Sequence, residues 1–263
     1  MDEDLGSVGD VTSDTLLSDQ QAKGELKAKQ QCILAGLAEA VDIFTHFGIQ
    51  VEQLAEDGDE VPSGEIVMRV NGDAKAILAA ERLALNIMTR MTGIATLTHE
   101  LIKTCQKKNP AIKIAATRKT TPGFRSYEKK AVALGGGMTH RYGLYDGIII
   151  KDNHLAFMSI REAIRKAKQH LDMPVEVEVE TVDEAVIAAE EEADIIMLDN
   201  MLPAKGKIAA SEAREVYPDV IIEVSGGITP ENITNYTYAD VISLGWLTHS
   251  VRSADLSLDL QRA

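Results

Sequence analysis

Short apolar runs alternate with segments of helical periodicity along the second half of the chain. From residue 110 onward the runs are IKIAAT (112–117), GIIIK (147–151), VEVEVE (175–180), ADIIMLD (193–199), VIIEVSGG (220–227) and DVISLG (240–245). The segments between them predict helices over 126–134, 157–170, 183–191, 203–216 and 230–236. Strands that alternate with helices of this length form parallel sheets. The pattern therefore predicts six parallel strands in an incomplete α/β barrel.

The first half of the chain follows a different pattern. Residues 1–20 are polar and acidic and predict a loosely structured start. Apolar alternation then predicts a small α+β unit with a helix at VDIFTHFG (41–48) and strands at QQCILAG (30–36), QVEQLA (50–55) and EIVMRVNG (65–72). Residues 74–108 carry apolar side chains at helical spacing, and Gly93 is predicted to divide them into two helices.

The composition excludes several classes of protein. A chain of 263 residues can form one large barrel, or a barrel with a small second domain. Its formal charge of −14 argues against nucleic acid as the main partner. Cys32 and Cys105 match neither a disulfide framework nor a zinc site. Because the sequence shows neither a membrane span nor a leader peptide, we expect a cytoplasmic protein.

Basic side chains gather in one segment of this acidic chain, from Thr117 to His154. They are Arg118, Lys119, Arg125, Lys129, Lys130, His140, Arg141 and Lys151. Such a cluster in an acidic protein indicates a bound anion. For Lys129 and Lys130, in the helical run SYEKKAVAL, a basic surface helix is the simpler interpretation. Four other cations end apolar or glycine-rich runs, where a charge needs a buried partner or a ligand. They are Arg118, Lys119, Arg141 and Lys151.

Nearly every predicted strand of the second half ends in a polar residue or a glycine. The ends are Arg118-Lys119, Lys151, Glu178 to Glu180, Asp199-Asn200, Ser225-Gly226-Gly227 and Gly245. A parallel barrel carries its active site at the carboxyl ends of its strands, so these residues predict one shared site. The glycines in SGGIT and SLGWLTHS predict a phosphate cradle, because backbone N–H groups can approach an anion there.

The run VEVEVE indicates a second feature of this site. Its valines share the face that packs on helices, so Glu176, Glu178 and Glu180 are expected to face the barrel lumen. An edge strand with its glutamates in solvent is the alternative. Together with Asp199 from the next strand, these carboxylates form an oxygen-rich site suited to Mg²⁺ shared with a substrate phosphate.

The chain closely resembles the quinolinate phosphoribosyltransferase family along almost its whole length. The resemblance rests on EDLGSVGDVTSD, ERLALNIMTRMTGIAT, TRKTTPGFR, EKKAVALGGGMTHRYGLYDGIIIKDNH, VEVEVE, IIMLDN, EVSGGIT and SLGWLTHSVRSADLSLDL, in the family's order. It implies an α/β sandwich with linking helices over residues 1–108, an open α/β barrel of about seven strands over 109–248, and a C-terminal segment, 249–263, that returns to the sandwich. It further implies a homodimer, or a higher oligomer, that takes part in de novo NAD biosynthesis.

The resemblance also implies a role for individual residues. The two carboxylates of quinolinate would be held by Arg118, His140 and Arg141, with Arg82 reaching in from the partner subunit. The residues expected to act on phosphoribosyl pyrophosphate, and counted as catalytic, are Lys119, Lys151, Glu178 and Asp199, the last two also holding Mg²⁺. The 5′-phosphate would be bound by Ser225, Gly226, Gly227 and Gly245, beside His249.

Three other functions are compatible with parts of the pattern. A relative that acts on nicotinate would not need all four carboxylate-binding positions. A non-catalytic metabolite binder would be expected to lose residues such as Lys119 or Asp199, which are present. A Schiff-base aldolase would use Lys151 at its strand end. The chain departs from the family pattern at Thr139, at Trp246 and by one extra residue in EDLGSVGD, which little sequence precedes.

Overall fold

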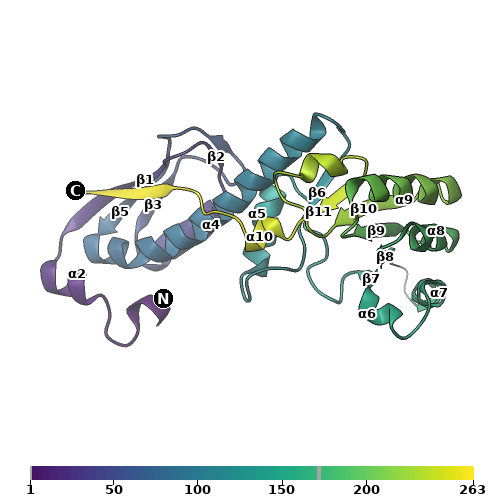
Figure 1. The fold of residues 1–263 in the computed structure, drawn as a ribbon. Helices are drawn as coiled ribbons and strands as arrows, with labels where there is room; N and C mark the ends of the chain where they lie inside the picture. The colour runs from purple at the N-terminus through teal and green to yellow at the C-terminus, as the bar shows by residue number, and fades with distance from the viewer. Residues whose placement is uncertain (1, 171–172) are drawn as a thin grey trace. The chain divides into compact units, whose positions relative to one another are not determined.

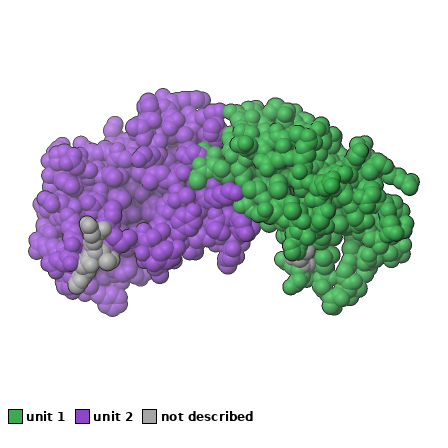
Figure 2. All heavy atoms as spheres, turned by 180° about the vertical axis from the view of Figure 1, so that it is seen from behind, with its two compact units in different colours: residues 1–97, 133–135, 251–263 green, residues 98–132, 136–250 purple. Residues whose placement is uncertain are grey.

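The computed structural model describes residues 2–170 and 173–263 and separates into two compact units (Figures 1 and 2). The first unit comprises residues 1–97, 133–135 and 251–263, and the second comprises residues 98–132 and 136–250. In the part of the chain that is described, no helix is long and apolar enough to span a membrane.

A four-stranded antiparallel sheet forms the framework of the first unit. Its order is β12 (Leu256–Arg262), β1 (Gln21–Ala28), β5 (Ile66–Asp73) and β3 (Gln50–Gln53). Alternate residues of β1 are buried, as expected for a strand with one covered face. The unit also contains helix α3 (Leu37–His46), whose Phe44 is fully buried in the core, and a short antiparallel pair of β2 (Cys32–Ile33) with β4 (Glu60–Val61).

The sequence predicted this unit only in part. The strands at 50–55 and 65–72 and the helix at 41–48 are confirmed, whereas QQCILAG forms only the two residues of β2. Strand β1 escaped prediction because QAKGELKA is mostly polar or small. The prediction of a loosely structured start is wrong, because this segment forms helices α1 (Asp2–Leu5) and α2 (Val11–Leu16). Asp10 caps α2 by accepting the N–H groups of Thr12 and Ser13 at 3.1 and 3.0 Å.

Helix α4 (Ala74–Gln106) is continuous, so the predicted break at Gly93 is wrong. A Cβ atom at Gly93 would lie 2.2 Å from the carbonyl oxygen of Arg252. The N–H of Ala254 donates to the carbonyl of Thr89 in the same region, at 2.8 Å. Gly93 is therefore present because the C-terminal segment passes against the helix, and its low helix propensity, worth about 1 kcal/mol, is outweighed by this packing.

The second unit is a parallel sheet whose strands alternate with helices along the chain (Figure 1). The sheet order is β6 (Lys113–Ala115), β11 (Val241–Ser243), β10 (Ile221–Ser225), β9 (Ile195–Asp199), β8 (Val175–Val179) and β7 (Ile148–Ile150). The intervening elements are α5 (Arg125–Leu134), α6 (Asp152–Leu155), α7 (Ile160–His170), α8 (Val182–Glu190), α9 (Pro203–Val216) and the 3₁₀ turn η1 (Ile233–Tyr236), followed by α10 (Trp246–His249). Every ladder between these strands is parallel, which confirms the six predicted strands.

The barrel is open. Strands β6 and β7 lie at the two ends of the ladder, and among the described residues no pairing joins them. A single isolated parallel bridge joins Ala115 of β6 to Met138. Alternate side chains of the central strands, such as Val177 and Val224, are fully buried, while Glu176 and Glu223 are buried on the opposite face. That second face is the lumen.

Candidate active site

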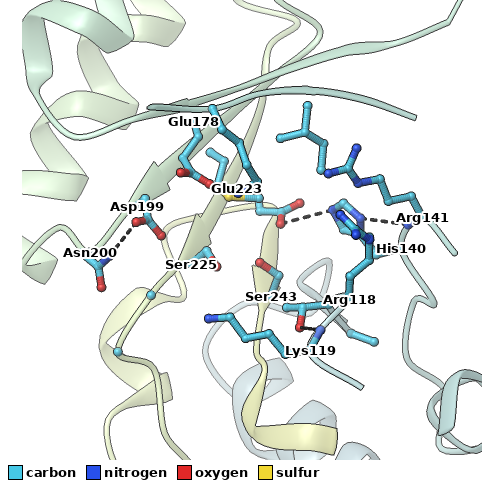
Figure 3. Close-up of a pocket in the computed structure, with 17 residues that line it drawn as sticks. Arg118, Lys119, His140, Arg141, Glu178, Asp199, Asn200, Glu223, Ser225 and Ser243 are labelled. Atoms are coloured by element: carbon cyan, nitrogen blue, oxygen red, sulfur yellow. Dashed lines mark hydrogen bonds and ion pairs between the residues drawn. The ribbon is translucent and has the colours of Figure 1, made fainter. Parts of the chain in front are cut away.

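A cavity of about 400 Å³ lies at the carboxyl ends of the parallel strands (Figure 3). The predicted site residues that line it are Arg118, Lys119, His140, Arg141, Lys151, Glu178, Asp199, Ser225, Gly226 and Gly227. They come from the ends of β6 to β10 and from the segment before β7, so residues far apart in sequence meet as expected for a parallel barrel. Figure 3 shows Glu178 and Asp199 on one side and His140 and Arg141 on the other.

Two predicted phosphate-site residues lie beside this cavity without lining it. A Cβ atom at Gly245 would lie 2.9 Å from Cδ of Lys119 and 2.9 Å from the imidazole of His249. The hydroxyl of Thr248 donates to the carbonyl of Lys119 at 2.6 Å, which ties helix α10 to the segment that carries this cation. Trp246 packs edge-on against His249, with ring centroids 6.5 Å apart.

Arg82 is the one predicted binding residue that belongs to the first unit. Its expected role requires a second subunit, so that role stays a prediction.

Like charges face one another on the basic side of the cavity. Burial lowers the pKa of Arg141, and the nearby Arg118 lowers it further. The Arg141 guanidinium also donates to the carbonyl of Gly147 at 3.0 Å, which fixes its orientation. Two guanidinium groups held close together are stabilised by an anion between them, and their planar forks suit carboxylate oxygens.

The opposite side carries carboxylates at the ends of two neighbouring strands. Glu178 forms an ion pair with the ammonium of Lys151. Asp199 accepts a hydrogen bond of 2.5 Å from the side-chain amide of Asn200. Within the described residues, these contacts use Oε2 of Glu178 and Oδ2 of Asp199. Oxygen ligands from adjacent strands are the donors that a hard divalent cation prefers, so Glu178 and Asp199 fit Mg²⁺.

Glycines shape the end of β10. Gly226 and Gly227 have φ values of 82° and 60°, which a side chain rarely adopts. A Cβ atom at Gly226 would also lie 2.4 Å from the amide oxygen of Asn200. The predicted helix over 230–236 is only the short turn η1. Successive glycines here leave the backbone N–H groups of the turn open to an anion.

Sequence reasoning missed Glu223, which lines the cavity and is only 2% exposed. The Nε2 atom of His140 lies 3.4 Å from Oε1 of Glu223 and 3.5 Å from Oε2 of Glu176. Both distances are within the range of an ion pair, and among the described residues Oε1 of each glutamate has no hydrogen-bond partner. The signal was present: a carboxylate interrupts the apolar run VIIEV just as carboxylates interrupt VEVEVE.

The charges in this cluster depend on one another. Burial, and then the neighbouring Glu223, raise the pKa of Glu176 to about 8. Burial alone lowers the pKa of His140, but Glu223 and Glu176 outweigh that effect and the pKa is raised. The three side chains could also hold a metal ion, since their ligand atoms all lie within 4.8 Å of one another. If Glu176 is protonated, the imidazolium of His140 balances the charge of the Glu223 carboxylate without a metal ion.

Two sequence-based interpretations need correction. Glu180 was expected in the lumen with Glu176 and Glu178, but it is exposed because β8 ends at Val179. The surface-helix interpretation is wrong for Lys129, which is 0% exposed. Its ammonium turns inward because backbone carbonyl groups accept its hydrogen bonds there.

Comparisons with known proteins agree over both units. Residues 10–92 match the family description "Quinolinate phosphoribosyl transferase, N-terminal domain", and residues 94–259 match the C-terminal domain of the same family. A probable nicotinate-nucleotide pyrophosphorylase (carboxylating) of Methanocaldococcus jannaschii is 43% identical over 263 residues, which are 97% of this chain and 92% of that protein.

Solved structures show the same similarity. The nicotinate-nucleotide pyrophosphorylase from Francisella tularensis has a TM-score of 0.92 and 37% identity, covering 99% of this chain and 92% of that one. A NadC deletion mutant in a cubic space group has a TM-score of 0.93 and 36% identity, covering 100% of this chain and 94% of that one.

Proposed function

The chain belongs to the quinolinate phosphoribosyl transferase family, and we propose that it converts quinolinate and phosphoribosyl pyrophosphate into nicotinate mononucleotide, pyrophosphate and CO₂. This is a pentosyl-transfer reaction of NAD biosynthesis. The observation that carries the proposal is the cavity itself, which is lined by two guanidinium groups, two carboxylates at strand ends and a glycine-rich turn. Such a site accommodates a dicarboxylate and a phosphorylated sugar together.

Quinolinate binds on the basic side. Arg118 and Arg141 donate paired hydrogen bonds to its two carboxylates, and the imidazolium of His140 adds a third cation. The carboxylate of Glu223 behind His140 favours its protonated form. A monocarboxylate such as nicotinate leaves part of this charge uncompensated, which favours quinolinate.

Phosphoribosyl pyrophosphate binds on the opposite side. Lys119 and Lys151 contact its phosphate groups, Glu178 and Asp199 accept from the ribose hydroxyls, and the glycine turn binds the 5′-phosphate. Gly245 and His249 complete the phosphate site, because a Cβ atom at Gly245 would overlap both the side chain of Lys119 and the imidazole of His249. Glu178 and Asp199 also fit Mg²⁺, which when bound supplies charge neutralisation for the pyrophosphate group.

The reaction follows from this placement. The pyridine nitrogen of quinolinate attacks C1 of the ribose, and the bond from C1 to the pyrophosphate oxygen breaks with its electron pair leaving on pyrophosphate. Carboxylates beside the sugar stabilise the oxocarbenium character that develops at C1. The positive ring nitrogen then stabilises the electron pair left on C2 when CO₂ departs, and C2 takes up a proton.

The oligomer and the location of the protein are part of the proposal. Arg82 reaches the quinolinate site of a partner subunit in a homodimer, and the protein works in the cytoplasm. Activity that falls on dilution of the protein, and is restored on concentration, supports the dimer. Constant specific activity in a demonstrated monomer contradicts it.

The proposed reaction is tested with quinolinate, phosphoribosyl pyrophosphate and Mg²⁺, following CO₂ and pyrophosphate. We expect both products in equal amounts from quinolinate, with nicotinate as the control substrate and with no product after chelation of the metal. Inert quinolinate would refute the reaction. A Schiff-base aldolase is disfavoured because Lys151 is engaged by Glu178, whereas that chemistry needs an unpaired neutral amine.

A further inference from the structure

Helix α5 buries a polar face that makes no contact in the proposed reaction. Lys129 is 0% exposed, and its ammonium donates to the backbone carbonyl of Thr139 and, at 2.8 Å, to that of Arg141. The residue between these two carbonyls is His140. One lysine therefore holds the backbone on both sides of a residue that binds the substrate.

A second cation of the same helix holds the next peptide. Arg125 donates from Nη1 to the carbonyl of Tyr142 at 2.8 Å. The ammonium of Lys129 also lies 5.3 Å from the centre of the Tyr142 ring, within reach of a cation–π contact. The segment from Thr139 to Tyr142 is thus attached to α5 by several hydrogen bonds from charged donors.

The backbone of this segment needs such anchors. His140 has a φ of 51°, in the left-handed region that a residue with a side chain rarely occupies. Strained conformations of this kind persist only where surrounding contacts impose them. In this conformation the side chains of both His140 and Arg141 line the cavity.

The same helix anchors the other segment that carries cations. Glu128 is fully buried and accepts the N–H of Thr121 at 3.1 Å and its hydroxyl at 2.9 Å. The guanidinium of Arg125 donates from Nε to the hydroxyl of Thr120 at 2.9 Å. These contacts lie directly after Arg118 and Lys119.

Burying a lysine is costly, and among the described residues no carboxylate lies within ion-pair distance of the Lys129 ammonium to offset that cost. Burial first, and then repulsion by Arg125, lower the pKa of Lys129 to about 8. A core position that only needed to be filled would be better occupied by an apolar side chain of the same length. The cost therefore indicates a need for the donors themselves.

We propose that Lys129 is a positioning residue, which holds the Thr139–Arg141 backbone so that His140 and Arg141 point at the carboxylates of quinolinate. The inference rests on the proposed function, because it specifies how the quinolinate half of that site is built. The hydrogen bonds of Lys129 do not reach the part of the sugar half that comes from β7 to β10, which holds Lys151, Glu178, Asp199 and the glycine turn. Loss of Lys129 should therefore weaken the binding of quinolinate and leave the binding of phosphoribosyl pyrophosphate nearly unchanged.

The test replaces Lys129 by methionine in the full-length protein, with Lys207→Met on the exposed face of α9 as the matched control. Calorimetric binding of quinolinate alone is measured first, then KM for each substrate and kcat. We expect Lys129→Met to weaken quinolinate binding roughly 10-fold to 100-fold, as when a support of a binding group is lost, and to change KM for phosphoribosyl pyrophosphate less than about 2-fold. Lys207→Met should match the wild type throughout.

A general packing role would give a different result. Equal weakening of both substrates, or unchanged quinolinate binding in a folded Lys129→Met protein, would overturn the proposal. If Lys129→Met does not fold, Arg125→Met removes the neighbouring anchor at Tyr142 and should weaken quinolinate binding in the same calorimetric measurement. Lys129→Arg keeps charged donors and should restore part of the affinity. Failure of the wild type to bind quinolinate would refute the proposed function, whereas wild-type binding without selectivity in the variants would refute this inference alone.

Discussion

The Nε2 atom of His140 lies 3.4 Å from a carboxylate oxygen of Glu223, a residue that is almost completely buried. This contact joins a side chain at the substrate cavity to a charge in the interior of the barrel. Because Glu223 raises the pKa of His140, the imidazole stays protonated to higher pH than burial alone would allow. If His140 binds the dianionic substrate as proposed, the affinity for that substrate is linked to Glu223, which need not contact it.

Glu223→Gln should weaken quinolinate binding while preserving the shape of the side chain. The amide lacks the negative charge that favours the imidazolium form of His140, so the pKa of His140 should fall. The affinity for quinolinate should then begin to decrease at a lower pH than in the wild type. We expect roughly 10-fold weaker binding at neutral pH. Calorimetry over a range of pH tests this, with Glu212→Gln on the exposed face of α9 as control. An unchanged pH profile would contradict the linkage between Glu223 and His140.

Arg118→Ala should remove one of the two guanidinium groups proposed to bind the quinolinate carboxylates. We expect kcat/KM for quinolinate to fall by about 100-fold or more, equivalent to roughly 3 kcal/mol of transition-state stabilisation. Steady-state kinetics with quinolinate varied at saturating phosphoribosyl pyrophosphate measures this. A near-normal kcat/KM would rule out the assigned role of Arg118.

The stability of the protein should depend on Lys129 at alkaline pH. Its folded-state pKa is lowered to about 8, so the folded state binds fewer protons than the unfolded state between about pH 8 and about pH 10.5. The free energy of unfolding of the wild type, relative to that of Lys129→Met, should therefore rise with pH across this window, by on the order of 2 kcal/mol. This gain in stability is lost again as the pH falls through the folded-state pKa of Lys129. Denaturant titrations of both proteins at several pH values provide the measurement. A constant difference would indicate that Lys129 titrates normally when folded.

Gly93→Ala should destabilise the first unit even though alanine favours helices. The added Cβ would overlap the carbonyl oxygen of Arg252, which lies 2.2 Å from its ideal position. We expect a loss of about 1–3 kcal/mol, the usual range for overpacking. Thermal and denaturant unfolding compare it with Glu100→Ala, an exposed substitution on the same helix that should change stability by less than about 0.5 kcal/mol. A stabilised Gly93→Ala protein would show that the C-terminal segment moves aside easily.

The parallel strands and most cavity residues could be predicted because both follow from local patterns. Apolar runs that alternate with helices define a parallel sheet, and such a sheet brings the strand ends together at one edge. Lys151, Glu178 and Asp199 could therefore be placed together before any geometry was known. Their grouping needed only strand order and direction.

Residues whose environment depends on distant backbone could not be predicted in this way. Lys129 has the helical spacing of a surface residue, and only the carbonyls of Thr139 and Arg141 explain why it is buried. Gly93 looks like a helix breaker until the path of Arg252 is known. The buried position of Glu223 was readable in principle, because a charge in an apolar central strand requires a partner.

The pairing of β12 with β1 has a consequence for synthesis on the ribosome. The residues of β12 emerge only after the whole of the second unit, whose last residue is Ser250. The barrel can therefore acquire its native contacts while β1 still exposes an unpaired edge, a position prone to intermolecular pairing. The first unit, although it begins the chain, must be the last to complete its sheet, so a chain whose second unit has emerged while β12 is still inside the ribosome would hold a folded barrel and an incomplete antiparallel sheet.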